Sequence, residues 1–498
     1  MTESIWEQLS PGLSVDHCQV EVPLRSPVEL IRALELPGSG PFFLLDSAGG
    51  NPDLCRYSFL AWDPRAEVRV RRGEVEVRGA GKKLRAPVAD PFAFLSRTLA
   101  ALAPREPVPP AAAGLPLTGG AFGLVSYDAG RYIERLPRLA ADDLDFPELF
   151  FIFPRRLICF DHRRGMAHLL FEDAGPGEMG RAERALRRQE LAPERPAPVS
   201  VGRHAFSLSS ATRSNMTRES FKHMVRRARE YILAGDVFQS NLSQRLEMEY
   251  REDSIELYDA LRQVNPSPFS GYIDMGDYQV ISSSPERLVQ LEGRRAQTRP
   301  IAGTRRRGVD NHEDHGLTRE LNLDPKERAE HIMLVDLERN DLGRVCEYGS
   351  VRVNELMVNE SYSHVIHIVS NVMGELHRSR NATDLLKAMF PGGTITGCPK
   401  VRCMEIIDEL EPVRRGPYTG SFGYIGYNGN MDMNIIIRTL VRRGDRVYAQ
   451  AGAGIVADSD PEREYSESLR KAEAMVRAVG MVVGGAPPSV RRPSVTYR

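Results

Sequence analysis

The sequence predicts an α+β protein that is built on antiparallel sheets. Strand-like runs alternate with amphipathic helical segments, but their spacing lacks the regular strand–helix–strand repeat that produces a parallel sheet. The chain has 498 residues, which is enough for one large enzyme or for two to three domains. Hydrophobic residues make up 41% of the sequence and charged residues 27%, a composition typical of a folded protein with a sizeable core.

The first part of the chain, residues 1–173, contains strand-like runs that are separated by Gly and Pro clusters. The clearest runs are residues 42–47, 57–62 and 150–161. Residues 174–200 are charged and rich in Pro and Ala, which is typical of a linker or surface excursion with one short exposed helix. We therefore expect an N-terminal region that ends at residue 173, followed by a linker up to residue 213.

The second part, residues 214–483, has stronger periodicity. Residues 220–235 predict an amphipathic helix that ends at Gly235, and residues 237–250 alternate like a strand. Further helices are expected at 327–341 and 461–479, and further strands at 364–376, 418–427 and 433–441. The tail, residues 484–498, is expected to be disordered.

Charge and cysteine content exclude several classes of function. Lys plus Arg (66) nearly balances Asp plus Glu (67), so no overall field would attract nucleic acid or an anionic membrane. The six cysteines include no CxxC pair, which indicates neither a disulfide framework nor a thiolate zinc site. The chain starts without a signal-peptide pattern and has no run of about 18 apolar residues, so we expect a cytoplasmic protein.

Two predicted helices each carry a pair of glutamates three residues apart, Glu327 with Glu330 and Glu464 with Glu467. This spacing places both carboxylates of a pair on one helix face. If the two faces meet, four hard oxygen donors are available for one Mg²⁺ that also takes a carboxylate from a ligand. Such pairs are also common on solvated helix faces, so one pair alone does not indicate a metal site.

Other candidate residues lie in strand-like segments. His364 or His367 could carry a proton or cap a substrate ring, and the alternative is a hydrogen-bonded core histidine. Glu286 follows Pro285 at a predicted strand end, which suits a general acid, although a surface carboxylate is the default. Arg438 interrupts an apolar strand and therefore needs an anionic partner, either a structural one or a ligand carboxylate.

The stretch RPIAGTRRRG, residues 299–308, predicts either a wall that faces an anion or a solvated basic turn. Gly303 frees the backbone, Thr304 offers a hydroxyl, and three arginines follow. If the stretch is such a wall, Ala302 marks a position in it that offers no nucleophilic side chain.

Residues 392–400, GGTITGCPK, contain the GxxxxG spacing of a phosphate loop. Cys398 and Pro399 occupy the positions where Lys and Ser or Thr must reach phosphates and Mg²⁺, which excludes a nucleotide site. A Gly-rich backbone that approaches a carboxylate remains compatible with this segment.

Nine ordered blocks between residues 217 and 479 resemble the chorismate-utilising enzymes, which include anthranilate synthase component I, aminodeoxychorismate synthase component I, and isochorismate and salicylate synthases. The blocks are DVFQSNLSQR, SSSPERL, RPIAGTRRRG, ERAEHIMLVDLERNDLGRV, SYSHVIHIVSNV, FPGGTITGCPKVRCMEIIDELEP, RRGPYTGSFGY, IIIRTL and AGAGIVADSDPEREYSESLRKAE. The resemblance implies a large antiparallel β-sandwich core surrounded by helices, with chorismate bound by residues 214–483. The N-terminal LLDS and GGAFGLVSYDAGRYIERLP resemble the corresponding region of the first two enzymes.

The resemblance also implies roles for individual residues. Mg²⁺ would be held by Glu330 and Glu467, with Glu327 and Glu464 in support. The other candidates for catalysis are His367, Glu286, Gln239, Ala302 and Thr304, where His367 corresponds to the family's catalytic histidine and Glu286 to the acid that protonates the departing C4 hydroxyl. Substrate-binding candidates are Gly303, Thr394, Tyr418, Arg438, Gly452, Gly454 and Lys471. A tryptophan effector site would include Leu45, Asp46 and Ser47, with Asp46 shorter than the glutamate that is usual there.

Gln239 indicates the nucleophile. Isochorismate and salicylate synthases resemble this chain but place a lysine at that position as the base that activates water, and a glutamine cannot take a proton at neutral pH. We therefore expect ammonia as the nucleophile. The chain has no GxCxGxQ motif of a glutaminase, so the ammonia is expected from a separate glutamine amidotransferase subunit.

Different segments resemble different ammonia-using enzymes, either anthranilate synthases or aminodeoxychorismate synthases. Ala302 gives the PIAGT typical of anthranilate synthases, whereas many aminodeoxychorismate synthases have a lysine there that forms a covalent adduct. Other segments favour aminodeoxychorismate synthases, namely PGGTITG, Asn241 in FQSNLSQR, YDAGRYIE and LLDS. A subgroup of those enzymes carries PIAGT and replaces the lysine with a first ammonia added at C2 and a second at C4.

We therefore predict aminodeoxychorismate synthase component I, an enzyme of the transaminase class on the folate branch that leads to 4-aminobenzoate. The alternative is anthranilate synthase component I, a lyase on the tryptophan branch. A third possibility, a non-catalytic subunit that senses an amino acid, is disfavoured because the chain retains Glu330, Glu467, His367, Glu286 and Arg438.

Overall fold

The computed structural model describes residues 15–49, 54–104, 109, 112–191, 212–308, 310–361 and 365–484. Three sequence expectations lie partly or wholly outside the described residues: His364, the second half of the expected linker and the expected tail beyond residue 484. Within the described ranges, no helix is both long and apolar enough to cross a membrane.

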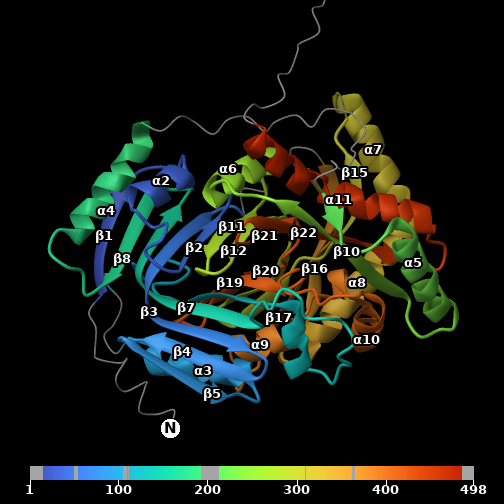
Figure 1. Cartoon of the computed structure of the whole chain (residues 1–498), viewed down its shortest axis with the longest axis horizontal. Coiled ribbons are helices and arrows are strands. Elements are labelled where there is room, and N and C mark those ends of the chain that lie inside the picture. The colour runs from blue at the N-terminus through green and yellow to red at the C-terminus, as the bar shows by residue number, and fades with distance from the viewer. Residues whose placement is uncertain are drawn as a thin grey trace, which may run out of the picture.

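The N-terminal part is mainly made of strands (Figure 1). It contains strands β1 (Val15–Glu21), β2 (Phe42–Asp46), β3 (Tyr57–Arg71), β4 (Glu74–Gly79), β5 (Lys82–Pro87), β6 (Gly120–Val125), β7 (Leu149–Asp161) and β8 (Met166–Glu172), helices α2 (Pro27–Ala33), α3 (Pro91–Leu102) and α4 (Glu178–Arg187), and 3₁₀ helices η2 (Tyr127–Tyr132) and η3 (Arg188–Leu191).

The second part interleaves strands with longer helices. Its strands are β9 (Arg213–Ser214), β10 (Gln239–Glu249), β11 (Phe269–Asp274), β12 (Gln279–Ser284), β13 (Arg287–Glu292), β14 (Arg295–Thr298), β15 (Ile301–Arg306), β16 (Arg352–Ser361), β17 (Val365–Glu375), β18 (Gly397–Cys398), β19 (Ser421–Gly426), β20 (Met431–Asn434), β21 (Thr439–Arg443) and β22 (Arg446–Ile455). Its helices are α5 (Arg218–Leu233), α6 (Ser254–Val264), α7 (Asn311–Leu323), α8 (Pro325–Gly343), α9 (Ala382–Met389), α10 (Lys400–Leu410), α11 (Pro461–Val483) and the 3₁₀ helix η4 (Gly393–Ile395).

The paired strands form two antiparallel layers. One layer runs from β3 through β2, β11, β12, β21 and β22 to β10. The other runs from β7 through β6, β19, β20, β13, β14 and β17 to β16. Between the layers lies a core of buried aromatic and aliphatic side chains, including Phe43, Phe122, Phe150 and Phe422. The predicted α+β class with an antiparallel sandwich core is confirmed.

The long strands β3 and β7 belong to both layers. Their pairing register shifts between Pro64 and Ala66, where Pro64 lies opposite Pro154. Proline has no N–H to donate, so it interrupts the ladder and allows both strands to bend. The halves of β3 on either side of the bend pair with β2 and with β4, respectively.

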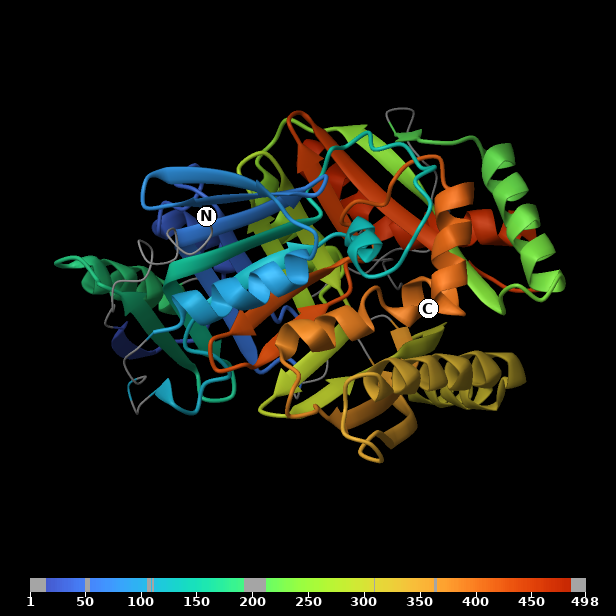
Figure 2. The same cartoon turned by 90° about the horizontal axis from the view of Figure 1, so that it is seen from below.

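Helices cover the outer faces of the sandwich (Figures 1 and 2). Helices α6 and α11 bury their apolar faces against the layer that contains β22, and α3, α8 and α9 do so against the layer that contains β13. Helix α4, in the expected linker, buries Ala182, Ala185 and Leu186. The expected short helix is therefore present with an exposed polar face, but its apolar face packs onto the core near β1.

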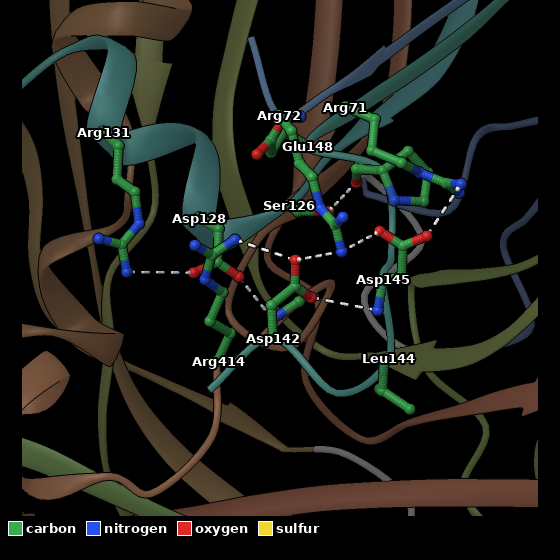
Figure 3. Close-up of polar contacts among 12 residues, drawn as sticks. Arg71, Arg72, Ser126, Asp128, Arg131, Asp142, Leu144, Asp145, Glu148 and Arg414 are labelled. Atoms are coloured by element: carbon green, nitrogen blue, oxygen red, sulfur yellow. Dashed lines mark hydrogen bonds and ion pairs between the residues drawn. The ribbon is translucent and has the colours of Figure 1, made fainter. Parts of the chain in front are cut away.

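The two parts of the chain are joined by hydrogen bonds and by ion pairs. Strand β2 pairs with β11, and β6 pairs with β19. Figure 3 shows charged residues of the loop that follows η2 in contact with other segments, with Arg414 to Asp142 at 3.1 Å and Arg72 to Asp145 at 2.8 Å. Arg414 belongs to residues 408–416, which lead to the site described below and which are also held by hydrogen bonds from Leu139 N–H to Asp408 and from Gly416 N–H to Asp128, both at 2.8 Å. The proposed division into an N-terminal region and a catalytic domain stays a prediction.

The structure differs from the sequence expectation at residues 433–441. A single strand was expected, but β20 ends at Asn434 and β21 begins at Thr439. Arg438 has a positive φ of 53°, a left-handed conformation that a non-glycine residue adopts only where its surroundings enforce it. The apolar run thus contains a kink that directs one arginine away from the sheet.

Candidate active site

A cavity of about 460 Å³ lies where strands of both layers meet helices α8 and α11. Strands β10, β15, β17 and β22 and both helices contribute side chains to it. The residues predicted for the chorismate site that line the cavity are Gln239, Glu286, Ala302, Gly303, Glu327, Glu330, His367, Thr394, Tyr418, Arg438, Gly452, Gly454, Glu464, Glu467 and Lys471. The side chain of Thr304 lies outside the described set.

Both acidic helices start with an Asp-Pro pair that fixes where their glutamates point. Asp324 caps α8 and Asp460 caps α11, each accepting hydrogen bonds from two backbone N–H groups of the first turn. The proline that follows each cap is preorganised for the first helical position. The glutamate pairs consequently lie near the start of each helix, and all four carboxylates line one cavity instead of facing bulk solvent.

The four carboxylates have different partners. Glu327 is ion-paired with Arg305 at 3.1 Å, and Glu467 with Arg470 at 2.6 Å. Glu330 accepts a hydrogen bond from Gln239 Nε2 at 3.0 Å. This contact joins two residues that are 91 positions apart in the sequence.

The electrostatics of these carboxylates favour a nearby cation. Burial raises the pKa of both Glu330 and Glu464, so their ionised forms are held at a cost that a positive charge would offset. Burial acts in the same direction on Glu467, but Lys471 and Arg470 outweigh it and lower the pKa of that group. Lys471 Nζ lies 3.9 Å from Glu467 Oε1.

The acidic cluster fits a hard divalent cation that keeps much of its water. In the described ranges, no three His, Cys, Asp or Glu side chains are close enough together to hold a metal ion by themselves. Mg²⁺ differs from zinc in that one or two carboxylates, several waters and a ligand oxygen usually suffice. The donors present are all carboxylate oxygens, which is the type that Mg²⁺ prefers.

Among the side chains that the structure describes, the cations that line the cavity are Arg438 and Lys471. Burial lowers the pKa of both groups, which shows that the protein holds positive charge here at a cost in solvation. Among the described residues, no carboxylate lies within ion-pair distance of Arg438, but Glu467 acts on it at longer range and raises its pKa. A ligand carboxylate in the cavity could supply the direct partner that the sequence argument requires. The Tyr418 ring lines the same part of the cavity.

Glu286 has the properties of a buried acid. It is 6% exposed, and burial raises its pKa to about 7, against the opposing effects of Thr394, the Ile301 backbone and Lys471. Its Oε1 atom has no hydrogen-bond partner among the described residues, and neither has Thr394 Oγ1, which lies near Glu286 but outside hydrogen-bonding geometry. Both atoms belong to residues that line the cavity, where a polar ligand could satisfy them.

His367 is a neutral imidazole in this site. Its Nδ1 lies 3.3 Å from the Gly303 carbonyl oxygen, which can only accept, so Nδ1 carries the proton and Nε2 is the basic nitrogen. Burial lowers its pKa to about 4. The Gly303 backbone has a positive φ of 63° at the point where the register of β15 shifts, and a Cβ there would lie 2.8 Å from Leu321 Cδ1, so this position favours glycine.

Two arginines of the basic stretch after Gly303 are engaged in ion pairs with nearby helices, and the side chain of Arg306 lies outside the described set. Arg305 bonds to Glu320, Asp324 and Glu327, and Arg307 bonds to Asp314. These acidic residues belong to helices α7 and α8 and their connection, so the charge of both arginines is used to hold the helices against β15. Ala302, by contrast, is buried in the cavity wall and offers no amine.

A buried polar chain behind the cavity was not found by sequence reasoning. Gln450 lines the cavity and donates to Ser243 Oγ, which donates to Glu411. Glu411 is ion-paired at 2.7 Å with Arg415, whose guanidinium lies over the Tyr418 ring. The glutamine in the strand AQAGAG, which otherwise contains only small residues, could have indicated this polar chain, because a buried polar side chain needs hydrogen-bond partners.

The residues of the expected effector site line a second cavity of about 310 Å³. Leu45, Asp46 and Ser47 lie there with residues of β13, β19 and β20. Asp46 is buried, accepts a hydrogen bond from Tyr258 at 2.9 Å and lies 3.0 Å from Arg262. The role of this second cavity stays a prediction.

Comparisons with known proteins agree on one family. Residues 40–477 match the model of the chorismate binding enzymes. Anthranilate synthase component 1 of Thermus thermophilus is 43% identical over 96% of this chain and all of its own length, and aminodeoxychorismate synthase component 1 of Bacillus subtilis is 45% identical over 88% of this chain and 91% of its own. The crystal structure of anthranilate synthase component I from Streptococcus pneumoniae has a TM-score of 0.72 at 34% identity, covering 85% of this chain and 92% of that one. With the cavity described above, these matches place the chain in the chorismate-binding enzyme family, as a chorismate-utilising enzyme.

Proposed function

We propose that this protein is aminodeoxychorismate synthase component I. It would convert chorismate and ammonia to 4-amino-4-deoxychorismate, the precursor of 4-aminobenzoate on the folate branch. Ammonia would come from a glutamine amidotransferase partner. Relatives that carry the name "component 1" support the existence of a second component.

The main observation in support of amination by ammonia is that Gln239 and Ala302 lie in the cavity wall. A lysine at the first position would activate water, and a lysine at the second would attack the ring itself. Neither amine is present, and the Gln239 amide is engaged with Glu330 at 3.0 Å. Ammonia needs no base to act as a nucleophile, so it is the nucleophile that such a cavity wall favours.

Substrate binding in this proposal uses the charges of the cavity. Chorismate is a dicarboxylate, and Arg438 and Lys471 are half-buried cations that line the cavity with the backbone at Gly452 and Gly454. Glu330 and Glu467, supported by Glu327 and Glu464, would hold Mg²⁺. When bound, that ion supplies positive charge beside a substrate carboxylate.

Proton transfer in this proposal uses Glu286 and His367. A hydroxide is a poor leaving group, so the C4 hydroxyl must be protonated as it departs. Glu286, with its pKa raised to about 7, retains a proton near neutral pH and can donate it. His367 presents its basic Nε2 nitrogen, because Nδ1 is held by the Gly303 carbonyl.

Two segments whose sequences resemble those of aminodeoxychorismate synthases contact each other, and this contact supports the choice of the folate branch. Asn241 Nδ2 donates to the Thr394 carbonyl at 2.9 Å, which ties FQSNLSQR to PGGTITG in the cavity wall. The second candidate is anthranilate synthase component I. Ala302, at a cavity position that is typically alanine in those enzymes, favours it.

Product identification decides between the two. Incubated with chorismate, Mg²⁺ and an ammonium salt, the protein should form a product that aminodeoxychorismate lyase converts to 4-aminobenzoate. Fluorescent anthranilate with an equal amount of pyruvate would instead identify anthranilate synthase. Glu330→Gln is the control, because it should abolish either product while the unfolding temperature is retained.

A further inference from the structure

An apolar patch lies on the surface next to the cavity wall. Leu233 is 71% exposed, Phe238 is 70% exposed and Val401 is 37% exposed. We call these three side chains the Phe238 patch. Large apolar side chains with this degree of exposure, gathered in one place, mark interaction surfaces in soluble proteins.

The three side chains are brought together by the turn between α5 and β10 and by the start of α10. The Phe238 backbone N–H donates to the Cys398 carbonyl at 2.8 Å, three residues before Val401. Asp236, in the same turn, is ion-paired with Arg402 at 2.7 Å. Figures 1 and 2 show α5 and α10 on the same side of the molecule.

The patch has the anatomy of a protein interface. Beneath it, Val237, Cys403 and Ile406 form a small buried cluster that gives the turn a rigid base. Around it lie polar groups in defined pairs, such as Arg402 with Asp236 and Tyr231 with Glu409 at 2.7 Å. An apolar centre with a polar rim on a preformed base is the usual construction of a docking site.

The position of the patch identifies its occupant. Phe238 and Gln239 are consecutive, and successive side chains of an extended chain point to opposite sides. Phe238 therefore points to solvent, whereas Gln239 lines the cavity and bonds to Glu330. At this point one strand pair, β10 with β18, separates the surface from the site, a thickness on the order of 10 Å.

We infer that the Phe238 patch is the docking surface of the glutamine amidotransferase component, which releases ammonia on the Gln239 side of the cavity. The inference rests on the proposed use of ammonia. The partner hydrolyses glutamine with water to glutamate and ammonia, and ammonia must reach the substrate before it is protonated in bulk solvent. A partner seated on the Phe238 patch releases ammonia one strand pair away from the cavity wall that lacks a base.

The test compares two sources of ammonia in the presence of the purified amidotransferase component of the same organism. The variants are Leu233→Glu, Phe238→Glu and Val401→Glu, singly and combined. Tyr348→Glu is the matched control, since Tyr348 is fully exposed and lies in the turn between α8 and β16. Turnover is measured with glutamine and with an ammonium salt, and complex formation is measured by analytical ultracentrifugation.

We expect the Phe238 and triple variants to lose about tenfold or more of their glutamine-dependent turnover and of their affinity for the partner. Ammonium-dependent turnover should stay within about twofold of wild type, because no cavity group is changed. Glutamine-dependent turnover and partner affinity that survive the triple change would overturn the inference, and so would an equal loss with both ammonia sources. A wild-type protein that makes neither amino product from ammonium salt would contradict the proposed function instead, while the binding measurement would still decide the docking surface.

Discussion

Replacing Gly454 with alanine tests whether the Gln239–Glu330 contact supports the site. A Cβ at this position would lie 2.5 Å from Gln239 Nε2, well inside van der Waals contact. Gln239 Nε2 already donates to Glu330 Oε1 at 3.0 Å, so the amide must move to clear the new methyl group, and that movement is expected to lengthen or break this hydrogen bond. The backbone of Gly454 does not have a positive φ, so the substitution acts through the side chain of Gln239.

The expected magnitude follows from the kind of bond that is lost. A hydrogen bond to a charged acceptor contributes about 1.5–3 kcal/mol. If that contribution supports the transition state, kcat/KM for chorismate falls by roughly ten- to 150-fold. The pKa of Glu330, which burial raises and Gln239 lowers, should rise further and weaken the response to Mg²⁺.

The assay measures kcat/KM with ammonium salt across a range of Mg²⁺ concentrations, together with the thermal unfolding midpoint. Gly480→Ala is the matched control, because a Cβ at Gly480 in α11 meets nothing within 4 Å. That change should leave kinetics unaltered and add up to about 1 kcal/mol of helix stability.

A double-mutant cycle isolates the cause. In a Gln239→Ala background, Gly454→Ala should cost almost nothing, because the atom it displaces is gone and Asn241 Oδ1 remains at an ordinary 3.5 Å. Wild-type kinetics in Gly454→Ala, or an equal loss in both backgrounds, would refute the reasoning.

Two further substitutions test the charges of the cavity. Glu286 must be protonated to act as an acid, so with free ammonia held constant kcat should fall about tenfold per pH unit above pH 7. Glu286→Gln should remove this fall of kcat with rising pH, together with most of the activity. A wild-type rate that is independent of pH between 6 and 9 would contradict the assignment. Arg438 is half-buried, and Glu467 favours its charged form without lying within ion-pair distance, so Arg438→Met should change the unfolding free energy of the ligand-free protein by less than about 1 kcal/mol. The same variant should increase KM for chorismate by at least about tenfold, and a lower melting temperature with unchanged KM in calorimetry and steady-state kinetics would count against a ligand-binding role.

Local signals in the sequence predicted several elements well. The alternation of residues 237–250 predicted β10, and Gly235, with a positive φ of 86°, lies in the turn expected to end the preceding helix. The three-residue spacing of the glutamates identified the faces of α8 and α11 that line the cavity. In each case the information lies within one or two helical turns or one strand.

Contacts between distant segments could not be predicted in this way. Nothing local to Gln239 shows that its amide meets Glu330, because that contact depends on how β10 and α8 pack. The use of Arg305 and Arg307 in ion pairs with α7 and α8 likewise depends on the position of both helices. The kink at Arg438 was missed because an apolar run favours a continuous strand, and only the folded surroundings hold its backbone in the left-handed region.

The hydrogen-bonded ladders between the two halves of the chain have a consequence for dissecting the protein. Residues 214–483 expressed alone would leave β11 without β2 and β19 without β6, exposing two rows of unpaired amides and carbonyls flanked by Tyr272 and Phe422. Such open edges recruit other chains, so the fragment should aggregate instead of forming a smaller enzyme. The halves are expected to regain activity only when they are produced together and can complete each other's sheet.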